Sequence, residues 1–417
     1  MQTSHMQITL ADFVRNTAEG EQAEAIVRKC VHCGFCTATC PTYQLLGDEL
    51  DGPRGRIYLI KQLLEGSEPS VRTQQHLDRC LTCLNCETAC PSGVQYGRLI
   101  DIGRQLLEPR VPRPMRSRLW RVLVKELCAG PWFAPAMRLA RVLRPLLPQV
   151  LKDKILPRSA PGAWPRRHHP RKMLLLAGCV QPSMAPNINA ATARVLDTIG
   201  IELLVPVAAG CCGAIRHHMS DQAGALRDAR GNIDAWWPHI EAGAEALVMN
   251  ASGCGAMVRQ YAHLLRHDAA YADRAERISA LTCDLAELLP PLLAPRLPLL
   301  ARTAAQRVVF HPPCTLQHAQ RIRGLVEALL RSSGAEVLPF KDPHLCCGSA
   351  GTYALLQPEL SNSLRDRKLQ ALMDAAPEVI LSANVGCIAH LAARAPIAVQ
   401  HWIEWLDARL ASSTNSI

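Results

Sequence analysis

The sequence predicts a mainly helical N-terminal domain followed by two repeated α/β domains that are rich in cysteine. Three observations lead to this prediction. A run of four cysteines occurs twice near the N-terminus, with every cysteine of the second run fifty positions after its counterpart. Apolar residues at helical spacing lie between and after these runs. In the second half of the chain a different cysteine pattern also occurs twice, each cysteine following a short apolar segment or the loop after one.

The two N-terminal runs read CVHCGFCTATCP and CLTCLNCETACP. Their spacing, C-x2-C-x2-C-x3-C-P, is that of bacterial two-cluster ferredoxins, in which the fourth cysteine of each run holds the neighbouring cluster. Soft thiolates are the ligands that such clusters need. The sequence therefore predicts two 4Fe-4S clusters with crossed ligands: Cys30, Cys33, Cys36 and Cys90 for one, and Cys80, Cys83, Cys86 and Cys40 for the other.

Zinc sites and disulfides are the alternatives for these eight cysteines. Zinc sites usually present paired C-x2-C units rather than four cysteines within eleven residues. The first twenty residues lack the basic and apolar segments of an export signal, so we expect a reducing, cytoplasmic environment in which disulfides are rare. The proline after each fourth cysteine should end the local helical turn and let the chain leave extended.

The segments beside the runs have the periodicity of amphipathic helices, which favours an α-helical ferredoxin arrangement over the small β-rich ferredoxins. Between the runs, Arg54 and Arg56 lie next to two glycines. An arginine there can donate to cluster sulfurs and raise a cluster's potential, and a solvated loop arginine is an equal alternative. The periodic positions are Ile57, Ile60 and Leu64, then Leu99, Ile102 and Leu106.

The formal charge of +10 comes from one segment. Residues 110–172 contain sixteen Lys and Arg against two acids, which is +14 and leaves about −4 for the rest of the chain. Two pieces of this segment, 118–127 and 136–143, place basic residues and leucines on different faces. Such helices lie on anionic membranes or dock to partner proteins, and packing on their own protein is the alternative.

No run of eighteen apolar residues occurs, so a membrane contact should be peripheral, on the inner face of the cell inner membrane. Nucleic acid is a poorer candidate partner because no nucleic-acid-binding motif accompanies the charge. The basic residues expected to take part are Arg118, Arg121, Lys125, Arg138 and Arg141.

The second half of the chain contains two copies of a pattern with a Cys-Cys-Gly motif. Corresponding cysteines are 135, 135, 135 and 133 residues apart. Apolar segments before the cysteines and helical stretches between them predict two α/β units with their cysteines at strand ends. The first copy contains Cys179, Cys211, Cys212 and Cys254, and the second contains Cys314, Cys346, Cys347 and Cys387.

These eight cysteines should bind a metal or a cluster, or shape a subunit interface. Disulfides are disfavoured because vicinal cysteines are poorly placed to bridge each other. Cys128 and Cys283 lie outside both copies, and we assign them no role. The expected domains are 1–110 (helical, two clusters), 111–170 (basic Pro- and Arg-rich connector), 171–295 (first cysteine-rich domain) and 296–417 (second cysteine-rich domain).

Over essentially its whole length the chain resembles the family of glycolate oxidase iron–sulfur subunits. The double run alone is shared with subunits of succinate dehydrogenase, anaerobic glycerol-3-phosphate dehydrogenase and heterodisulfide reductase, and longer segments narrow the resemblance. These segments are CVHCGFCTATCPTYQLLGDELDGPRGRIYLIKQ, LDRCLTCLNCETACPSGV, NIDAWWPHIEAGAEA, CTLQHAQ and HLCCGSAGTYAL.

The resemblance implies that FAD-binding glycolate oxidase subunits oxidise glycolate to glyoxylate, and that electrons pass through this chain to a membrane quinone or another acceptor. No G-x-G-x-x-G fingerprint follows a predicted strand, so we expect the flavin on a partner and no substrate oxidation by this chain alone. The alternatives are a heterodisulfide-reductase-like subunit with catalysis at its Cys-Cys-Gly domains, and the iron–sulfur subunit of anaerobic glycerol-3-phosphate dehydrogenase.

The chain departs from the heterodisulfide reductase pattern at the last cysteine of each copy. That pattern ends in CxxC, whereas here Ala251 and Asn384 occupy the first position of the pair. This departure puts an extra catalytic cluster in doubt and leaves an ordinary cluster or a zinc ion open. His311 and His344 lie near the second copy's cysteines and can supplement them as ligands, although a structural histidine is the interpretation we favour.

Overall fold

The computed structural model of the chain describes residues 6–146, 155, 160–300 and 305–414. Contacts divide the chain into two units, and each is described by itself. The first unit contains Met1–Val122 and His344–Leu364, and the second contains Leu123–Pro343 and Arg365–Ile417. The predicted connector is described only in part, because residues 147–154 and 156–159 lie outside the described residues.

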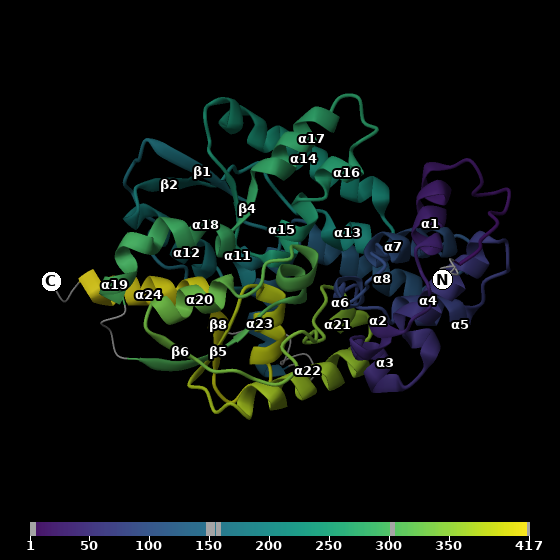
Figure 1. Cartoon of the computed structure of the whole chain (residues 1–417). Coiled ribbons are helices and arrows are strands. Elements are labelled where there is room, and N and C mark those ends of the chain that lie inside the picture. Colours follow the sequence, from purple (N-terminus) through teal and green to yellow (C-terminus); the bar gives the residue numbers. More distant parts are fainter. Residues whose placement is uncertain (1–5, 147–154, 156–159, 301–304, 415–417) are drawn as a thin grey trace. The chain divides into compact units, whose positions relative to one another are not determined.

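The first unit is helical, and its described residues include no β-strand (Figure 1). Helix α8 (Met115–Ala129) and helix α22 (Pro358–Met373) each extend past the residue at which the contact division falls. The other elements are α1 Ala18–Arg28, α2 Phe35–Ala38, α3 Pro41–Leu46, the 3-10 helix η1 Glu49–Asp51, α4 Pro53–Leu64, α5 Val71–Asp78, α6 Asn85–Thr88, α7 Tyr96–Leu107 and α21 Tyr353–Leu356.

Helices α1, α4 and α7 contact one another and enclose the core of the first unit. Gly103 lets α7 approach α4 closely, since a Cβ atom there would lie 2.7 Å from the side chain of Ile60. The helical periodicity predicted from the sequence is confirmed. Five of the six positions named for it are buried, namely Ile57, Ile60, Leu64, Leu99 and Ile102, and Leu106 is partly buried against the same core.

The sequence predicts that the chain leaves the first cysteine run in an extended conformation, and this prediction is wrong. Cys40 itself is extended, with φ −85° and ψ 116°, but Pro41 is the first residue of α3. The fixed φ of proline suits the first position of a helix, where no backbone N–H is needed. Pro41 therefore starts a helix at this point. After Cys90 the chain makes a turn.

The second unit contains two four-stranded parallel sheets, with strand orders β2-β1-β3-β4 and β6-β5-β7-β8. The identical order confirms the predicted repeat of two α/β units. The four apolar segments that the sequence predicts to precede cysteines form β1, β3, β5 and β7. The strands are β1 Arg171–Leu175, β2 Ile201–Leu204, β3 Leu247–Met249, β4 Thr282–Asp284, β5 Gln306–His311, β6 Ala335–Val337, β7 Val379–Ser382 and β8 Ala398–His401.

Helices connect the parallel strands, as crossover connections require. In the first copy they are α11 Gln181–Met184, α12 Asn187–Thr198, α13 Ala214–His218, α14 Gln222–Glu241, α15 Ser252–Val258, α16 Tyr261–Leu264, α17 Ala272–Leu281 and α18 Leu285–Leu293. In and before the second copy they are η3 Ala294–Arg296, α19 Leu297–Leu300, the π-turn η4 Thr315–Ala319, α20 Leu325–Ser332, α23 Val385–Ala392 and α24 Trp402–Thr414. The connector contributes α9 Phe133–Leu143 and η2 Arg144–Leu146.

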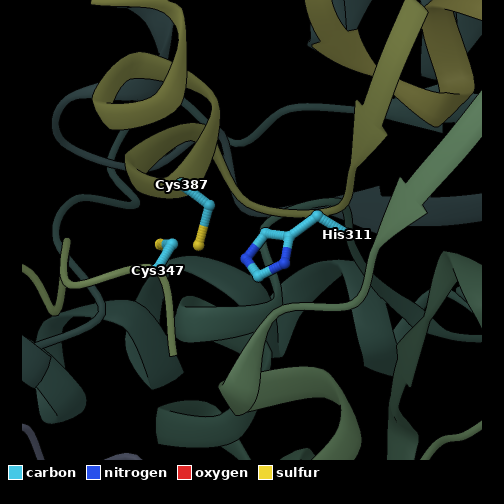
Figure 2. A group of neighbouring side chains, drawn as sticks. All are labelled: His311, Cys347 and Cys387. Carbon is cyan, nitrogen blue, oxygen red and sulfur yellow. The ribbon is translucent and has the colours of Figure 1, made fainter. Parts of the chain in front are cut away.

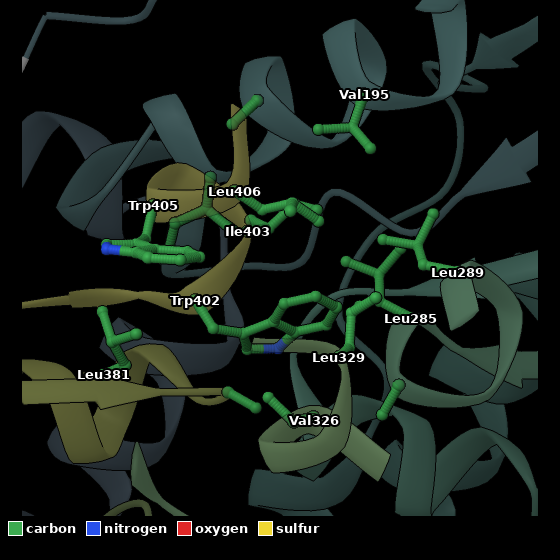
Figure 3. Close-up of a cluster of buried hydrophobic side chains, with 14 of the residues drawn as sticks. Val195, Leu285, Leu289, Val326, Leu329, Leu381, Trp402, Ile403, Trp405 and Leu406 are labelled. Carbon is green, nitrogen blue, oxygen red and sulfur yellow. The ribbon is translucent and has the colours of Figure 1, made fainter. Parts of the chain in front are cut away.

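The two repeats share one hydrophobic core, because the last helix of each packs on the first long helix of the other. Helix α12 contacts α24, and α18 contacts α20. Figure 3 shows Val195 of α12, Leu285 of α18 and Trp402 of α24 in this core, where all three side chains are fully buried. An ion pair of 2.6 Å between Arg194 and Asp407 adds a polar contact between α12 and α24. The repeats therefore form one folded body.

Candidate functional site

The first cysteine cavity lies in the helical unit. The thiols of Cys30, Cys33, Cys36 and Cys90 line it, and Cys86 also borders it. Cys33 is exposed, whereas Cys30 is buried and the other two of the four are half-buried. Three cysteines of the first run and the last cysteine of the second run therefore face one space.

The two runs have the same backbone conformation. His32 and Thr82, fifty residues apart, both have left-handed φ angles, 51° and 52°. Gly34 and Leu84 follow with φ of 84° and 60° and precede the short helices α2 and α6. A non-glycine residue in this region costs about 1–2 kcal/mol. The runs thus keep a strained turn that curls the chain around each cavity.

The second cysteine cavity is lined by Cys40, Cys80, Cys83 and Cys86. Cys83 is half-buried and the other three are buried. This set also combines three cysteines of one run with the fourth of the other. Because Cys86 borders both cavities, the two spaces adjoin.

The electrostatics of the thiols follow the same grouping. Burial raises the pKa of Cys86 well above its usual value, and the three other thiols of the second cavity raise it further. Burial raises the pKa of Cys36 to about 11, and the three other thiols of the first cavity add to the increase. Four thiols that oppose one another's ionisation become stable thiolates when a cation binds among them. The donor sets therefore fit one 4Fe-4S cluster in each cavity, and the ligand assignment stays a prediction.

Cys80 has a different environment from the other thiols. Burial raises the pKa of Cys80, but the nearby Arg56 and Arg104 outweigh burial and lower it. The Thr82 N–H donates to Cys80 Sγ at 3.4 Å, and the Tyr96 hydroxyl donates to it at 3.6 Å. Sequence reasoning singled out Arg56 but missed Arg104 and Tyr96. Arg104 had a signal, since it lies fifty positions after Arg54, the offset of the cysteines.

The four cysteines of the first Cys-Cys-Gly copy come together in the second unit. The thiols of Cys179 and Cys212 donate hydrogen bonds to the sulfur of Cys211, which lowers the pKa of Cys211 to about 3. Cys212 also donates to Cys254. The four thiols thus form a chain of hydrogen bonds from Cys179 through Cys211 and Cys212 to Cys254. Four neighbouring thiols suit a cluster or a zinc ion.

The two cysteines without an assigned role lie in the second unit. Burial raises the pKa of Cys128 to about 11, and the charge of Cys211 adds to that increase. Burial also raises the pKa of Cys283 to about 11, with Glu287 adding to it. Cys283 lies on β4. Neither observation gives these residues a function.

Each Cys-Cys-Gly motif depends on its glycine. Gly213 and Gly348 have φ of 87° and 89°, and each donates its N–H, at 3.4 Å, to the sulfur two residues earlier. A Cβ atom on Gly348 would lie 2.5 Å from the carbonyl oxygen of Ser361. On Gly213 it would lie 3.1 Å from the carbonyl oxygen of Ala225. The motif therefore needs a residue without a side chain at this position.

The cysteines of the second copy are divided between the two units. Cys346 and Cys347 belong to segment 344–364 of the first unit, whereas Cys314 and Cys387 belong to the second unit. Figure 2 shows His311 at the end of β5 and Cys387 on α23, both within the second unit. A ring nitrogen of His311 and the sulfur of Cys387 lie within 4.8 Å of one another.

His311 is a buried imidazole without hydrogen-bond partners. Its side chain is 1% exposed, and neither ring nitrogen has a partner among the described residues. Burial lowers the pKa of His311 well below its usual value, so the ring is neutral and keeps a free lone pair. A structural histidine, the interpretation favoured from the sequence, would normally be hydrogen-bonded. The unpaired nitrogens therefore favour the ligand interpretation.

Within the first unit, segment 344–364 lies beside the second cysteine cavity. The Asn85 side chain on α6 donates to the carbonyl oxygens of Thr39, at 2.9 Å, and His344, at 3.2 Å. The Tyr353 hydroxyl donates to the carbonyl oxygen of Arg79 at 3.1 Å. His344 thus contributes its backbone to this contact, and the segment carrying the second cysteine pair is held against the second run.

The two positions that lack a cysteine serve as helix N-caps. Ala251 precedes α15, and Asn384 precedes α23. The Asn384 side chain accepts a hydrogen bond from the Gly386 N–H at 3.0 Å. Asparagine is a preferred N-cap residue because it satisfies a free backbone donor of the helix. Asn384 therefore has a structural role at this position.

The connector forms the two predicted amphipathic helices, α8 and α9, but some of its charges are used internally. Lys125 pairs with Asp221 at 2.7 Å, and Arg141 donates to the carbonyl oxygen of Ser183 at 2.7 Å. For these two side chains the contacts favour the alternative interpretation, packing on their own protein, and membrane binding by the segment stays a prediction. Leu139 and Trp132 are 60% and 69% exposed. Within the described ranges, no helix combines the length and apolar character needed to span a bilayer.

Comparison with known proteins places this geometry in a family. A family model described as a 4Fe-4S dicluster domain matches residues 26–94. One described as a cysteine-rich domain matches residues 173–259 and 308–392. Together with the observed sheets, these matches confirm the predicted fold class, a helical ferredoxin domain followed by two repeated α/β cysteine-rich domains. The bounds of the four expected domains stay a prediction.

Two curated relatives match nearly the whole chain. The glycolate oxidase iron-sulfur subunit of Escherichia coli (strain K12) is 52% identical over 408 residues, covering 97% of this chain and 99% of the relative. A probable glycolate oxidase iron-sulfur subunit of Bacillus subtilis (strain 168) is 30% identical over 408 residues, covering 90% of each chain. Lactate utilization protein A of Bacillus licheniformis is 27% identical over 247 residues, covering 57% of this chain and all of the relative.

Proposed function

The chain belongs to the family of glycolate oxidase iron–sulfur subunits, and on that premise we propose how it works and with which partners. It is an iron–sulfur electron-transfer subunit that acts in glycolate oxidation. The observation that carries this function is the pair of adjoining cavities in the first unit, each lined by cysteines of both runs. Catalysis at the Cys-Cys-Gly domains and a role in anaerobic glycerol-3-phosphate oxidation are not favoured.

Bound 4Fe-4S clusters supply one-electron carriers. The residues of this chain hold them and control their surroundings. The four thiolates of each cavity anchor one cluster, and burial of most of these thiols limits the access of water. Cys86, which borders both cavities, keeps the two sites adjacent. Adjacent carriers suit a subunit that passes electrons on without transforming a substrate.

The finer proposal concerns the partners. FAD-binding glycolate oxidase subunits oxidise glycolate to glyoxylate, and the two electrons then pass one at a time through this chain to a quinone or another acceptor. The absence of a dinucleotide-binding fingerprint in the sequence supports a flavin on another polypeptide. The name of the Escherichia coli relative, a subunit of glycolate oxidase, also supports the proposal that other subunits carry the flavin.

The test is the reduction of the purified chain. With its clusters loaded, the chain should stay oxidised when mixed with glycolate and should be reduced by dithionite. Adding the flavoprotein partner should allow glycolate to bleach the cluster absorbance. Bleaching by glycolate in the absence of any flavoprotein would contradict the proposal.

We also propose that the Cys-Cys-Gly copies hold a metal, either a further cluster or zinc. The support is the chain of hydrogen-bonded thiols in the first copy and the unpaired, neutral His311 beside Cys387 in the second unit. A zinc ion takes imidazole and thiolate ligands together. A metal-free role at a subunit interface is the alternative.

The proposed location is the cytoplasm, with peripheral contact on the inner face of the inner membrane. The support is the excess of positive charge in residues 110–172 together with exposed apolar side chains on α9, where Leu139 and Val142 are 60% and 74% exposed. Such a contact would bring the chain near a membrane quinone.

A further inference from the structure

Arg54 and Arg56, two of the arginines between the cysteine runs, have opposite environments. The Arg56 side chain is 1% exposed, and its guanidinium donates to the carbonyl oxygen of His76, at 2.7 Å, and to Thr42 Oγ1, at 3.2 Å. The Arg54 side chain is 36% exposed and pairs with Glu49 at 2.6 Å. Each arginine has a carboxylate near it, but solvent screens the charge of Arg54 and does not reach that of Arg56.

Arg56 lies at the wall of the second cavity, the one lined by Cys40, Cys80, Cys83 and Cys86. Thr42 Oγ1, which accepts from Arg56, is 3.3 Å from Cys40 Sγ. One hydroxyl group therefore separates the guanidinium from a predicted ligand sulfur.

The negative charge near Arg56 does not cancel the positive charge. Asp51 is fully buried and lies 3.4 Å from Arg56, but it also pairs with Arg79 at 2.8 Å. Asp51 thus serves two guanidinium groups, and the neighbouring carboxylate, Asp48, is exposed, so water screens its charge. The buried charge is therefore positive. In a buried site this charge is screened far less than it would be in water.

Hydrogen-bond donors add to the difference between the cavities. Each run supplies one equivalent backbone N–H, that of His32 to Cys30 and that of Thr82 to Cys80. Cys80 also accepts from the hydroxyl of Tyr96, which is 3% exposed. In the first cavity the Thr37 side chain lowers the pKa of Cys36 by a hydrogen bond. The second cavity therefore combines its side-chain donor with a buried positive charge that the first does not have.

Arg104 is the residue of the second run that corresponds to Arg54, because it lies fifty positions later. The two arginines can therefore be compared directly. It donates to the carbonyl oxygens of Leu77, at 2.8 Å, and Cys80, at 2.7 Å. Arg54 likewise donates to a carbonyl oxygen of its own run, that of His32, at 3.3 Å. Both arginines thus donate to backbone carbonyl oxygens near their own cysteine run. Arg54 differs in that it also forms an ion pair with Glu49.

We propose that Arg56 and Tyr96 raise the reduction potential of the cluster in the second cavity above that of the cluster in the first. Reduction adds one negative charge to a cluster, and a buried cation and donors to its sulfurs stabilise that charge. One electron from the partner's reduced flavin, received at the first cavity, then passes to the second, which reduces that cluster and reoxidises the first. The inference rests on the proposed function, since it needs both clusters to be present.

The experiment is a redox titration of the cluster-loaded full-length chain with dithionite and mediators, followed by electron paramagnetic resonance. The unaltered chain should show two midpoint potentials. Arg56→Met should lower the higher one alone. At the potential where that cluster is half reduced in the unaltered chain, its ratio of reduced to oxidised form should fall at least tenfold, which is about 59 mV for one electron.

Three further variants distinguish a direct effect on the reduction potential from an effect on folding. Arg56→Lys keeps the charge and should restore most of the shift. Tyr96→Phe removes one donor with little change of shape and should lower the same potential by a smaller amount. Arg54→Gln, the exposed control, should leave that potential unchanged.

Iron analysis of every variant distinguishes the possible failures. Equal potentials in the unaltered chain, a shift of the lower potential, or unchanged potentials in an iron-replete Arg56→Met chain would overturn the inference while the proposed function stands. If the Arg56→Met chain loses iron, its potential cannot be used, and the test is then the potential of Tyr96→Phe. An unchanged higher potential in that variant would overturn the inference. An unaltered chain that binds no iron under anaerobic reconstitution would instead refute the proposed function.

Discussion

The left-handed glycine of a Cys-Cys-Gly motif should be among the least replaceable residues of the chain. For Gly348→Ala we expect a loss of about 3 kcal/mol, because the left-handed backbone costs about 1–2 kcal/mol and the new Cβ meets a backbone oxygen that cannot move freely. The midpoint of thermal unfolding, followed by circular dichroism, measures the effect.

Gly351 provides the matched control for this prediction. It has φ of 62° in the same segment, and no atom lies within 4 Å of the position that a Cβ atom would take there. Gly351→Ala should therefore cost only the backbone contribution, about 1–2 kcal/mol. Equal destabilisation by the two substitutions would mean that the contact with Ser361 carries no energy.

The crossed ligand sets predict which cysteine variants resemble each other. Cys90→Ser should give the same altered cluster spectrum as Cys33→Ser, because both remove a ligand from the first cavity. Cys40→Ser should resemble Cys83→Ser for the second cavity. Electron paramagnetic resonance and iron content measure the outcome, and each variant should lose up to about half of its iron, since each cavity would hold one of two clusters. A Cys90→Ser spectrum like that of Cys83→Ser would mean that the ligands are not crossed.

At the residue scale, the sequence predicts features that depend on residues close together in the chain. The spacing of eleven residues within each run is enough to identify cluster-type ligands, because the ligand turn is built from neighbours. The environment of Arg56 is not local. Thr42, Asp51 and His76 reach it from three separate elements, so nothing in the GPRGR segment distinguishes the buried arginine from the exposed one.

At the scale of elements, the strands before the cysteines could be predicted because each is a short apolar segment with a marked end. The outer strands β2, β4, β6 and β8 have weaker patterns, and the sequence did not place them individually. The sequence also could not predict that segment 344–364 groups with the first unit. It depends on polar contacts such as Asn85 to the His344 carbonyl oxygen, between residues far apart in the chain.

The Cys-Cys-Gly copies should retain metal when the ferredoxin runs cannot bind any. In a chain with all eight ferredoxin cysteines changed to Ser, we expect residual iron or zinc by elemental analysis, because the thiols of the first copy and the unpaired His311 form separate donor sets. Adding Cys211→Ser and Cys212→Ser should remove the share held by the first copy, and His311→Leu should weaken the share held by the second.

Cys283→Ser is the control in the same background, since Cys283 lies outside both copies and should not alter the metal content. A folded chain without iron or zinc before these additional changes would leave only the interface role for the Cys-Cys-Gly cysteines.

At the scale of the whole molecule, the charge is organised so that one segment is strongly basic while the rest is slightly acidic. The structure refines which charges are available. Lys125 and Arg141 are committed to internal contacts, whereas Arg138 and Arg144 are exposed beside the apolar side chains of α9 and η2. A surface with exposed cations next to exposed apolar groups is suited to an anionic bilayer. The useful variants are therefore different from those that the sequence suggested.

The last prediction tests peripheral membrane binding with Arg138→Gln and Arg144→Gln combined. Each basic residue near an anionic surface contributes about 1 kcal/mol, so losing two should weaken binding by roughly thirtyfold at low salt. Salt screens this attraction over about 8 Å at physiological strength, so binding by the unaltered chain should also fall as salt rises. Co-sedimentation with vesicles containing anionic lipid measures both effects. Trp132→Ser with Val142→Ser should weaken binding independently of salt, because these side chains contribute apolar contact.

Arg227→Gln with Arg277→Gln is the charge-matched control, since both arginines are exposed and lie outside the connector. This pair should leave binding close to that of the unaltered chain if the attraction is local to α9. Equal weakening by the two pairs would indicate a response to net charge alone. Binding that is indifferent to salt and to anionic lipid would mean that the exposed face of α9 contacts a partner subunit, because its apolar groups would then be covered by protein and not by lipid.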